Sequence, residues 1–256
     1  IPPGGYVNFS LPLITFWDAA RIHMEKVKES ILLKFYFRSL ISGGSGSLVL
    51  TGSPSLAFDV NMDDEIYRRD VNKLYDNNIV RNMYLDCFNI SSSYTFTAGQ
   101  TTKISLQNIV YKVPFLVFCI RSSNTTTNNG LNNFASLGSI TDTQQYNIQV
   151  QDPTSYDILN RGSGLGPNDI QLINATYNEN NLFSNQNLYL IPFCTNIKQA
   201  VTGQQSSGFF YFDGSLFNLA INPGSSWVNG TYNVDVYVYY YRCWEISNGN
   251  IDVCSY

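Results

Sequence analysis

The acidic residues between positions 59 and 70 have the types and spacing that could do chemistry. Asp59, Asn61 and Asp63 place oxygen atoms at alternate positions, as a calcium-binding loop does, and Asp70 stands where such a loop carries its last carboxylate. The loop also needs a glycine for its sharp turn, and Asp64 occupies that position. Acidic residues gather equally at the start of a helix, where they offset the helix dipole. We therefore predict a helix over 63–74 and no bound metal or other cofactor, with calcium as the alternative.

Other candidate motifs match catalytic or phosphate-binding patterns only in part. The glycine-rich run 161–167 lacks the Lys-Ser/Thr ending of a phosphate loop and has Pro167 where a helix would open, so we predict a surface loop. His23 is the only histidine and has no local partner for a catalytic triad. A carboxylate pair for sugar hydrolysis would have to come from Asp18, Asp157, Asp213 and Asp235, which no local pattern joins. We predict that the chain is not an enzyme, with a glycosidase as the alternative.

The charge balance argues against a nucleic-acid surface. The 256 residues include 15 Lys and Arg against 19 Asp and Glu, a net charge of −4. Phosphate backbones are bound by clustered Lys and Arg, and the densest basic stretch, 21–38, is interrupted by Glu25 and Glu29. Charged residues make up 13% of the chain, against about 25% in an average soluble protein. This deficit favours a protein whose surface is largely covered by neighbours.

The cysteines form neither a zinc motif nor an evident disulfide framework. They are widely spaced, without a CxxC or CxxH pair: Cys87, Cys119, Cys194, Cys243 and Cys254. Cys119 and Cys194 lie in apolar runs, so we expect them to be buried and reduced. This favours a reducing compartment, although five Asn-x-Ser/Thr sequons, at Asn8, Asn89, Asn124, Asn174 and Asn229, favour the secretory route. The longest apolar run, 113–120, is too short for a membrane span.

Strand signals dominate the chain, so a β-rich scaffold must position these side chains. Eight strand segments are predicted, over 11–20, 28–41, 83–90, 101–121, 146–151, 188–193, 208–221 and 232–246. The segment 101–121 is expected to be one long strand, or two strands broken near Pro114. Helix signals are confined to 63–74 and 152–159, and long connections cover 42–82, 122–145 and 160–187. Eight strands with long, uneven connections predict an all-β, eight-stranded jelly-roll sandwich in one domain, 1–256.

The last predicted strand shows the clearest alternation of apolar and polar residues. One parity carries Val234, Val236 and Val238, which we assign to the core together with Phe212. Arg242 breaks this parity. The opposite parity carries Tyr237, Tyr239 and Tyr241, which we predict to be interface residues or anchors for a second layer.

Several segments also resemble a known family when they are compared in order. The run Phe-Ser-Leu-Pro-Leu-Ile at 9–14 and the run Arg-Ile-His-Met-Glu-Lys-Val at 21–27 are similar to a Leu-Pro-Leu-Ile segment and a His-Glu-Val-like strand. The run Tyr-Leu-Asp at 84–86, the segment 108–120, the segment 188–193 and the pair Ser207-Gly208 follow in the matching order. Together they resemble the second jelly roll of double jelly-roll major capsid proteins from eukaryotic DNA viruses, in the giant-virus, virophage and polinton-like lineage. The chain would be a divergent member.

The resemblance implies a structural role in a virion. It implies that the chain is the second roll of a two-roll subunit, with the first roll preceding Ile1. It further implies a homotrimer that forms pseudo-hexameric capsomers of an icosahedral shell, assembled in the host cytoplasm. Its partners would be neighbouring capsomers, minor capsid proteins and an internal membrane layer, without direct contact to nucleic acid. The alternative is a lectin-like carbohydrate-binding jelly roll of a secreted or cell-surface protein, with Trp17, Trp227 or Tyr side chains as stacking platforms.

Overall fold

The computed structural model describes residues 79–122, 134–159, 163–177, 187–202, 207–247 and 250–255, and a few single residues before them. The predicted strand at 11–20, all but Lys28 of the strand at 28–41, and His23 lie outside the described residues. Glu65, Arg69, Asp70 and Lys73 have helical backbone, as predicted for 63–74.

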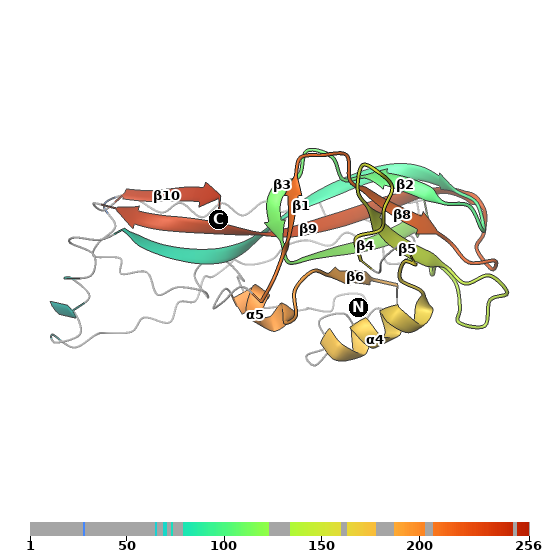
Figure 1. The fold of residues 1–256 in the computed structure, drawn as a ribbon, viewed down its shortest axis with the longest axis horizontal. Helices are drawn as coiled ribbons and strands as arrows, with labels where there is room; N and C mark the ends of the chain where they lie inside the picture. The colour runs from blue at the N-terminus through green and yellow to red at the C-terminus, as the bar shows by residue number, and fades with distance from the viewer. Residues whose placement is uncertain are drawn as a thin grey trace, which may run out of the picture.

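Ten antiparallel strands and two helices make up the described part of the chain (Figure 1). The strands are β1 Val80–Phe96, β2 Thr102–Ser105, β3 Val110–Val113, β4 Phe115–Ser122, β5 Asn147–Gln151, β6 Tyr189–Pro192, β7 Phe210–Asp213, β8 Asn218–Asn222, β9 Gly230–Ser247 and β10 Asn250–Ser255. The helices are α4 Pro167–Tyr177 and α5 Ile197–Thr202. None of the helices in this part of the chain is long and apolar enough to cross a membrane.

The strand order is that of a jelly roll. A large sheet has the order β1-β9-β4-β6, with β10 also paired to β9, and a small sheet has the order β2-β8-β5. From β1 to β9 the chain passes repeatedly between these sheets, so sheet neighbours are distant in sequence. This is the double Greek key of a jelly-roll sandwich. A two-stranded ribbon of β3 and β7 accompanies the sandwich. The all-β jelly-roll prediction is therefore confirmed.

Strand β9 joins most of the large sheet. It pairs with β1 from Gly230 to Ile246 along one edge. Along its other edge it pairs first with β4, from Tyr232 to Tyr239, and then with β10, from Arg242 to Ser247. In Figure 1, β9 and β1 run along the molecule together, and β10 lies beside the far end of β9.

The main core fills the space between the large and small sheets. Val234, Val236 and Val238 of β9 are buried in it, and Phe212 is buried with them, as the alternation predicted. The small sheet contributes alternate apolar residues such as Ile148 and Val150 of β5, since successive strand residues point to opposite faces.

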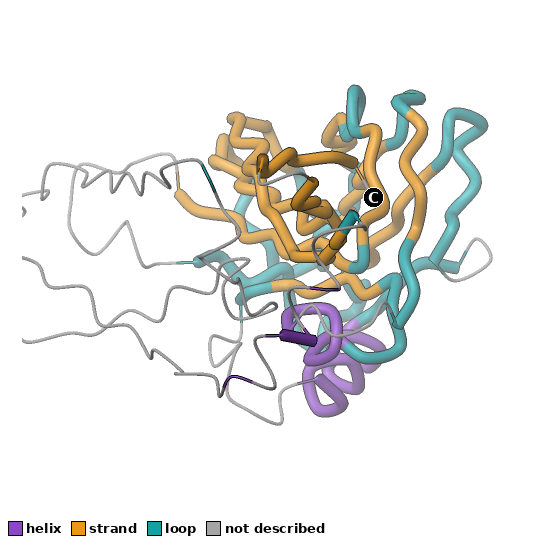
Figure 2. The backbone as a smooth tube through the Cα atoms, turned by 90° about the vertical axis from the view of Figure 1, so that its left-hand side faces the viewer, coloured by secondary structure: helices purple, strands orange, loops and turns teal. Residues whose placement is uncertain are grey.

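A second apolar cluster lies on the opposite face of the large sheet. Tyr241 of β9 packs there with Phe115 and Val117 of β4 and with Ile197 and Ala200 of α5. Asn196 begins α5 by accepting a hydrogen bond from the backbone N–H of Gln199 at 3.1 Å, which caps the helix. Figure 2 shows both helices on the same side of the strands. One end of the outer sheet face is therefore covered by the chain itself.

Two predicted strands are divided in the structure. The segment 101–121 contains β2, β3 and β4, because the chain turns at Asn108, which has a positive φ of 66°, and breaks again at Pro114. The segment 208–221 contains β7 and β8, separated by a turn at Gly214 with a φ of 86°. Within the described residues, six predicted segments therefore contain the nine strands β1 to β9, and β10 was not predicted.

The helix predictions were wrong at two places. The segment 152–159 forms turns, because the Asp152 carboxylate accepts hydrogen bonds from the backbone N–H groups of Thr154 and Tyr156 at 2.8 and 2.9 Å. The predicted connection 160–187 instead contains α4. Pro167 opens that helix, where a proline is tolerated because the first N–H of a helix has no intrahelical partner.

Candidate assembly surface

The candidate functional surface is the face of the large sheet that points away from the main core. We call it the outer face. On β9 it carries Asn233, Asp235, Tyr237, Tyr239, Tyr241, Cys243 and Glu245, which alternate with the core residues. The register places Ser91 and Cys87 of β1 and Cys119 and Phe115 of β4 beside Asp235 and Tyr239. The outer face therefore has a polar end around Asp235, an aromatic middle at Tyr237 and Tyr239, and a second charged end at Glu245.

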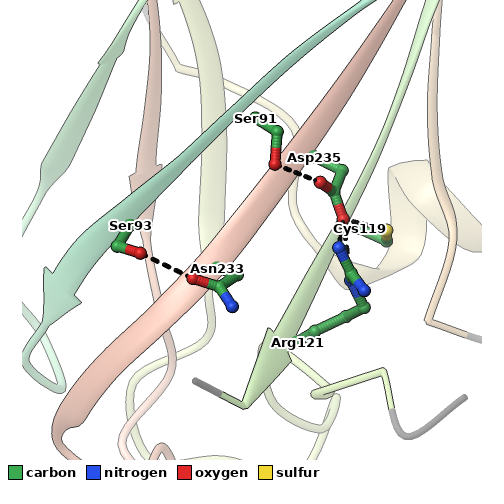
Figure 3. Close-up of polar contacts among 6 residues, drawn as sticks. All are labelled: Ser91, Ser93, Cys119, Arg121, Asn233 and Asp235. Atoms are coloured by element: carbon green, nitrogen blue, oxygen red, sulfur yellow. Dashed lines mark hydrogen bonds and ion pairs between the residues drawn. The ribbon is translucent and has the colours of Figure 1, made fainter. Parts of the chain in front are cut away.

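A buried carboxylate organises the polar end of the outer face (Figure 3). Asp235 is 3% exposed, and its Oδ2 accepts a hydrogen bond from Arg121 Nε at 2.7 Å. A second guanidinium nitrogen of Arg121 completes the ion pair. Ser91 Oγ donates to Asp235 Oδ1 at 2.5 Å from the other neighbouring strand. Because a buried charge is costly without partners, these contacts tie β1, β9 and β4 together.

The polar end has a structural role, although its cysteine, aspartate and arginine are residue types that also occur around catalytic cysteines. Cys119 Sγ lies 3.9 Å from Asp235 Oδ2. Burial, and then the charge of Asp235, raise the pKa of the Cys119 thiol to about 11. A nucleophilic cysteine needs a lowered pKa, so that the thiolate is present at neutral pH. The contacts of Cys119 therefore do not support catalysis.

The aromatic middle of the outer face contains two half-buried tyrosines. Tyr239 stacks on Phe115 with ring centroids 4.6 Å apart, and Tyr237 lies next to it on the same face. Exposed residues of β1, Cys87 and Asn89, are their register partners. Burial raises the pKa of Tyr239 to about 12, so its hydroxyl is neutral at physiological pH. Tyr237 and Tyr239 thus present amphipathic rings that are only partly covered by their own chain.

Tyr241 has a different environment from the other two tyrosines. It is 1% exposed, lies in the cluster with α5 and makes an edge contact with Phe209 at 6.5 Å. The three tyrosines were predicted to be interface residues or anchors for a second layer. The surroundings of Tyr241 agree with the second of these roles.

The break in the alternation at Arg242 has a local explanation. Its Nη1 donates to Asp86 Oδ2 at 3.1 Å, and Tyr240 also donates its hydroxyl to this oxygen at 2.8 Å. Asp86 stands opposite Tyr240 on β1. A polar group on the core parity of β9 is therefore paired by a polar group on the neighbouring strand.

Of the four residues in the candidate calcium site, the structure describes only Asp70, and the contacts of Asp70 do not favour calcium. Asp59, Asn61 and Asp63 lie outside the described residues, whereas Asp70 is exposed. Its Oδ1 lies 3.8 Å from Arg69 Nε and 3.9 Å from Lys73 Nζ. In the described ranges, no three His, Cys, Asp or Glu side chains gather closely enough to hold a metal ion.

The described part of the glycine-rich run is occupied by acidic side chains. The backbone N–H of Gly164 donates to Asp157 Oδ2 at 3.1 Å, and that of Gly166 donates to Asp169 Oδ2 at 2.9 Å. A phosphate loop offers such N–H groups to an anionic ligand. Here the protein's own carboxylates take that place, which agrees with a structural loop.

The described carboxylates proposed for sugar hydrolysis serve three different parts of the fold. Asp157 caps backbone groups beside β5, and Asp213 accepts from the Ser215 N–H at the β7–β8 turn. Asp235 belongs to the outer face. Trp227, proposed as a stacking platform, is 7% exposed and packs against Phe96 and Tyr232.

One exposed apolar surface was missed by sequence reasoning. On the β3–β7 ribbon, Val110 and Tyr211 are each 51% exposed, and Leu216 beyond the ribbon is 60% exposed. Phe210 and Phe212 of the same ribbon point inward, where they contact Phe217. The alternation of inward and outward aromatics over 209–213 indicates such a surface, whereas a single strand over 208–221 does not separate this ribbon from β8.

These features define a jelly-roll protein with a partly covered outer face.

No family model matches the chain, and no curated protein matches it in sequence. Among solved structures, the chain is similar to PBCV-1 VP54 fitted into a cryo-EM reconstruction of the virophage Sputnik, with 12% identity and a TM-score of 0.42 over 74% of this chain and 54% of that one. It is also similar to the Faustovirus major capsid protein, with 11% identity and a TM-score of 0.44 over 65% of this chain and 34% of that one. A chain of the cyanophage Pam1 capsid gives 11% identity and a TM-score of 0.26 over 75% of this chain and 96% of that one. The chain thus spans about half or less of the first two.

Proposed function

We propose that this chain is a structural capsid protein that builds an icosahedral viral shell. The observation that carries the proposal is the position of the family-like motifs on the fold. The run Tyr-Leu-Asp at 84–86 lies on β1, the segment 108–120 covers β3 and β4, and the segment 188–193 contains β6. These motifs thus lie on β1, β3, β4 and β6, and three of these four strands belong to the large sheet of the jelly roll.

The pair Ser207-Gly208 gives one of these motifs a physical role. Ser207 Oγ donates to the Asn196 carbonyl at 2.7 Å and accepts from the Asn196 N–H at 3.1 Å. Gly208 has a φ of 127°, which an L side chain rarely adopts. The pair therefore fixes the start of α5 beside the approach to β7, so its place in the fold supports the resemblance.

We further propose that the subunit is a homotrimer with a pseudo-hexameric outline and that this chain supplies its second roll. Tyr237 and Tyr239 on the outer face, and Tyr211 and Val110 on the ribbon, are the proposed contact residues. Rings of this kind are favoured at the centre of interfaces, whereas charged residues are depleted there. The charged share of 13% supports extensive contacts of this kind.

The other proposed partners follow from the shell. They are neighbouring capsomers, minor capsid proteins and an internal membrane layer, in a virion assembled in the host cytoplasm. The net charge of −4 agrees with a protein that does not itself hold the genome. We propose no catalytic role. The buried position of Trp227 removes one of the platforms on which a carbohydrate-binding role would rest.

Light scattering of the purified two-roll subunit that contains this chain, followed by electron microscopy, tests the proposal. We expect a mass of three subunits and particles with a hexagonal outline. The double change Val110→Ser and Tyr211→Ser should reduce the trimer fraction and leave the melting temperature nearly unchanged, since both side chains are 51% exposed. Tyr156→Ser, at a 53% exposed tyrosine in the turn after β5, is the matched control and should remain trimeric. A stable monomer of the unaltered protein at high concentration would contradict the trimer.

A further inference from the structure

Two cysteines face each other at the second charged end of the outer face. Cys243 of β9 and Cys254 of β10 are register partners, and their Sγ atoms lie 3.1 Å apart. Both are free thiols in the structure. Figure 1 shows β10 alongside β9 at this end of the molecule. The two sulfurs are therefore held together by a strand ladder.

This arrangement suits a covalent bond between the two sulfurs. Residues directly opposite on antiparallel strands point to the same face, with Cβ atoms about 4.5–5.5 Å apart. A disulfide requires the sulfurs to be about 2.05 Å apart, so they need to approach by about 1 Å. Because β10 is paired with β9 from Asn250 to Ser255, the two cysteines stay close together and need only a small local movement to react.

The remaining cysteines have other neighbours. Cys119 lies beside Asp235, the Cys87 thiol contacts the carbonyl of Phe88, and Cys194 belongs to the apolar cluster under α5. The pair at β9–β10 thus stands apart as the one brought together by strand register in the described part of the chain.

The two thiols differ in access. Cys243 is 7% exposed, whereas Cys254 is partly exposed on the last described strand. The hydrogen bond with Cys243, and then burial, raise the pKa of the Cys254 thiol to about 11. Since the thiolate is the attacking species, the pair should react slowly at neutral pH and faster in alkali.

We propose that Cys243 and Cys254 are a redox modification site, at which a low-molecular-weight disulfide such as oxidised glutathione oxidises the pair to an intrachain disulfide. The Cys254 thiolate attacks one glutathione sulfur, which breaks the glutathione S–S bond and releases one glutathione thiolate. Cys243 then loses its proton and attacks the Cys254 sulfur, which forms the new S–S bond and releases the second glutathione. Two electrons pass from the protein thiols to the oxidant, and two protons end on the released glutathione.

The modification would fasten β10 to β9, a property separate from the proposed capsid function. Six residues of β10 pair with β9. On the same strand, the Val253 side chain is 51% exposed and so contributes little packing. A covalent link at Cys254 should suppress fraying of this strand. Because the site lies within one chain, its oxidation is measurable whether or not the protein assembles into trimers.

Thiol counting after oxidation tests the proposal. The folded, reduced protein is incubated with excess oxidised glutathione at mildly alkaline pH, and free thiols are then counted in denaturant. We expect the count to fall from five to three per chain. Amide exchange of β10 should slow by at least about tenfold in the oxidised form.

Peptide mapping locates the bond. The tryptic peptide that follows Arg242 carries both Cys243 and Cys254, so the disulfide makes it lighter by two hydrogen atoms. Cleavage after Glu245 then separates the two cysteines into halves that remain joined until they are reduced.

Two single variants complete the test. Cys254→Ser should keep all its remaining thiols or carry one glutathione, whereas Cys119→Ser, the matched control, should still lose two. A wild-type count that stays at five, a stable glutathione adduct on Cys254, or a bond mapped to any other cysteine pair would each overturn the proposal. Since the peptide map is made on the unaltered protein, it decides the matter even if a variant fails to fold.

Discussion

Arg121 and Asp235 lie 114 residues apart in the chain, yet the guanidinium of one neutralises the buried carboxylate of the other on adjacent strands. The carboxylate side chain is 4% exposed and the Arg121 side chain 23% exposed. Water therefore contributes little to the solvation of Asp235, and the pair with Arg121 crosses the β4–β9 ladder diagonally, since the register partner of Arg121 is Asn233.

Replacing Arg121 by Met should destabilise the protein by about 3 kcal/mol, because it leaves a buried carboxylate without its cation. Urea unfolding measures the change. The double variant Arg121→Met with Asp235→Asn should recover most of the loss, since the charge disappears while Ser91 can still donate to the amide oxygen. Arg81→Met, which breaks the exposed pair with Glu245, is the control and should change stability little. Equal losses for both single variants would contradict this account.

Val236→Asp should prevent folding, because Val236 is 0% exposed in the main core and an unpaired charge there is costly. Circular dichroism and gel filtration of the soluble fraction check this expectation. The matched variant Val253→Asp places the same charge on an exposed strand position and should fold normally. Folded trimers of Val236→Asp would refute the orientation of β9.

Tyr189 should make stability depend on pH in alkali. Burial raises its pKa from 10.0 to about 12 in the folded protein, where its hydroxyl accepts the Leu137 N–H at 2.8 Å. An acid whose folded pKa is raised is neutral in both states below pH 10, so the full stability is present there. The unfolded chain ionises first as pH rises from 10 toward 12, which removes about 2–3 kcal/mol.

Tyr189→Phe should therefore flatten this part of the stability profile by that amount, although its stability at pH 7 also falls by about 1 kcal/mol through the lost hydrogen bond. Denaturant unfolding between pH 7 and 12 in the presence of a reductant measures both effects. Tyr156→Phe, at an exposed position, should leave the profile unchanged. Parallel profiles for Tyr189→Phe and the unaltered protein would count against the assignment.

Gly208→Ala should cost about 1–3 kcal/mol. The residue has a φ of 127°, and an added Cβ would lie 3.2 Å from the Phe193 carbonyl and 3.3 Å from the Cys194 Cα, which are backbone atoms. Gly166→Ala is the matched control, since its nearest neighbour would be 3.8 Å away and its φ is not in the strained region. Thermal unfolding compares the two, and an equal effect would show that Gly208 is not strained.

Local pattern located the chain segments that contain β1 to β9, but not all of their divisions and not their partners. The alternation in β9 identified its core face, and Val234, Val236 and Val238 are buried as expected. The division of 101–121 depended on a turn at Asn108, whose positive φ no alternation could indicate. The helix α4 was missed because Pro167 was judged an obstacle, although the first turn of a helix accepts it.

The outer face was harder to predict than the core because its character depends on tertiary contacts. The three tyrosines of β9 look equivalent in sequence, yet α5 and Phe209 cover Tyr241 and leave Tyr237 and Tyr239 half-buried. Asp235 appeared as one of several scattered carboxylates, and its pairing with Arg121 follows from strand register over a long sequence separation. Cys243 and Cys254 became neighbours only through β10, a strand that the alternation did not predict.

The position of β9 in the large sheet has a consequence for biosynthesis. Both β1 and β4 leave the ribosome well before β9 but pair with it rather than with each other. Until residue 247 has emerged, the large sheet lacks the strand that joins its halves, and their apolar faces stay unpaired. Such late, long-range pairing makes folding slow and exposes intermediates to aggregation. The large sheet should therefore complete its folding only after β9 has been synthesised.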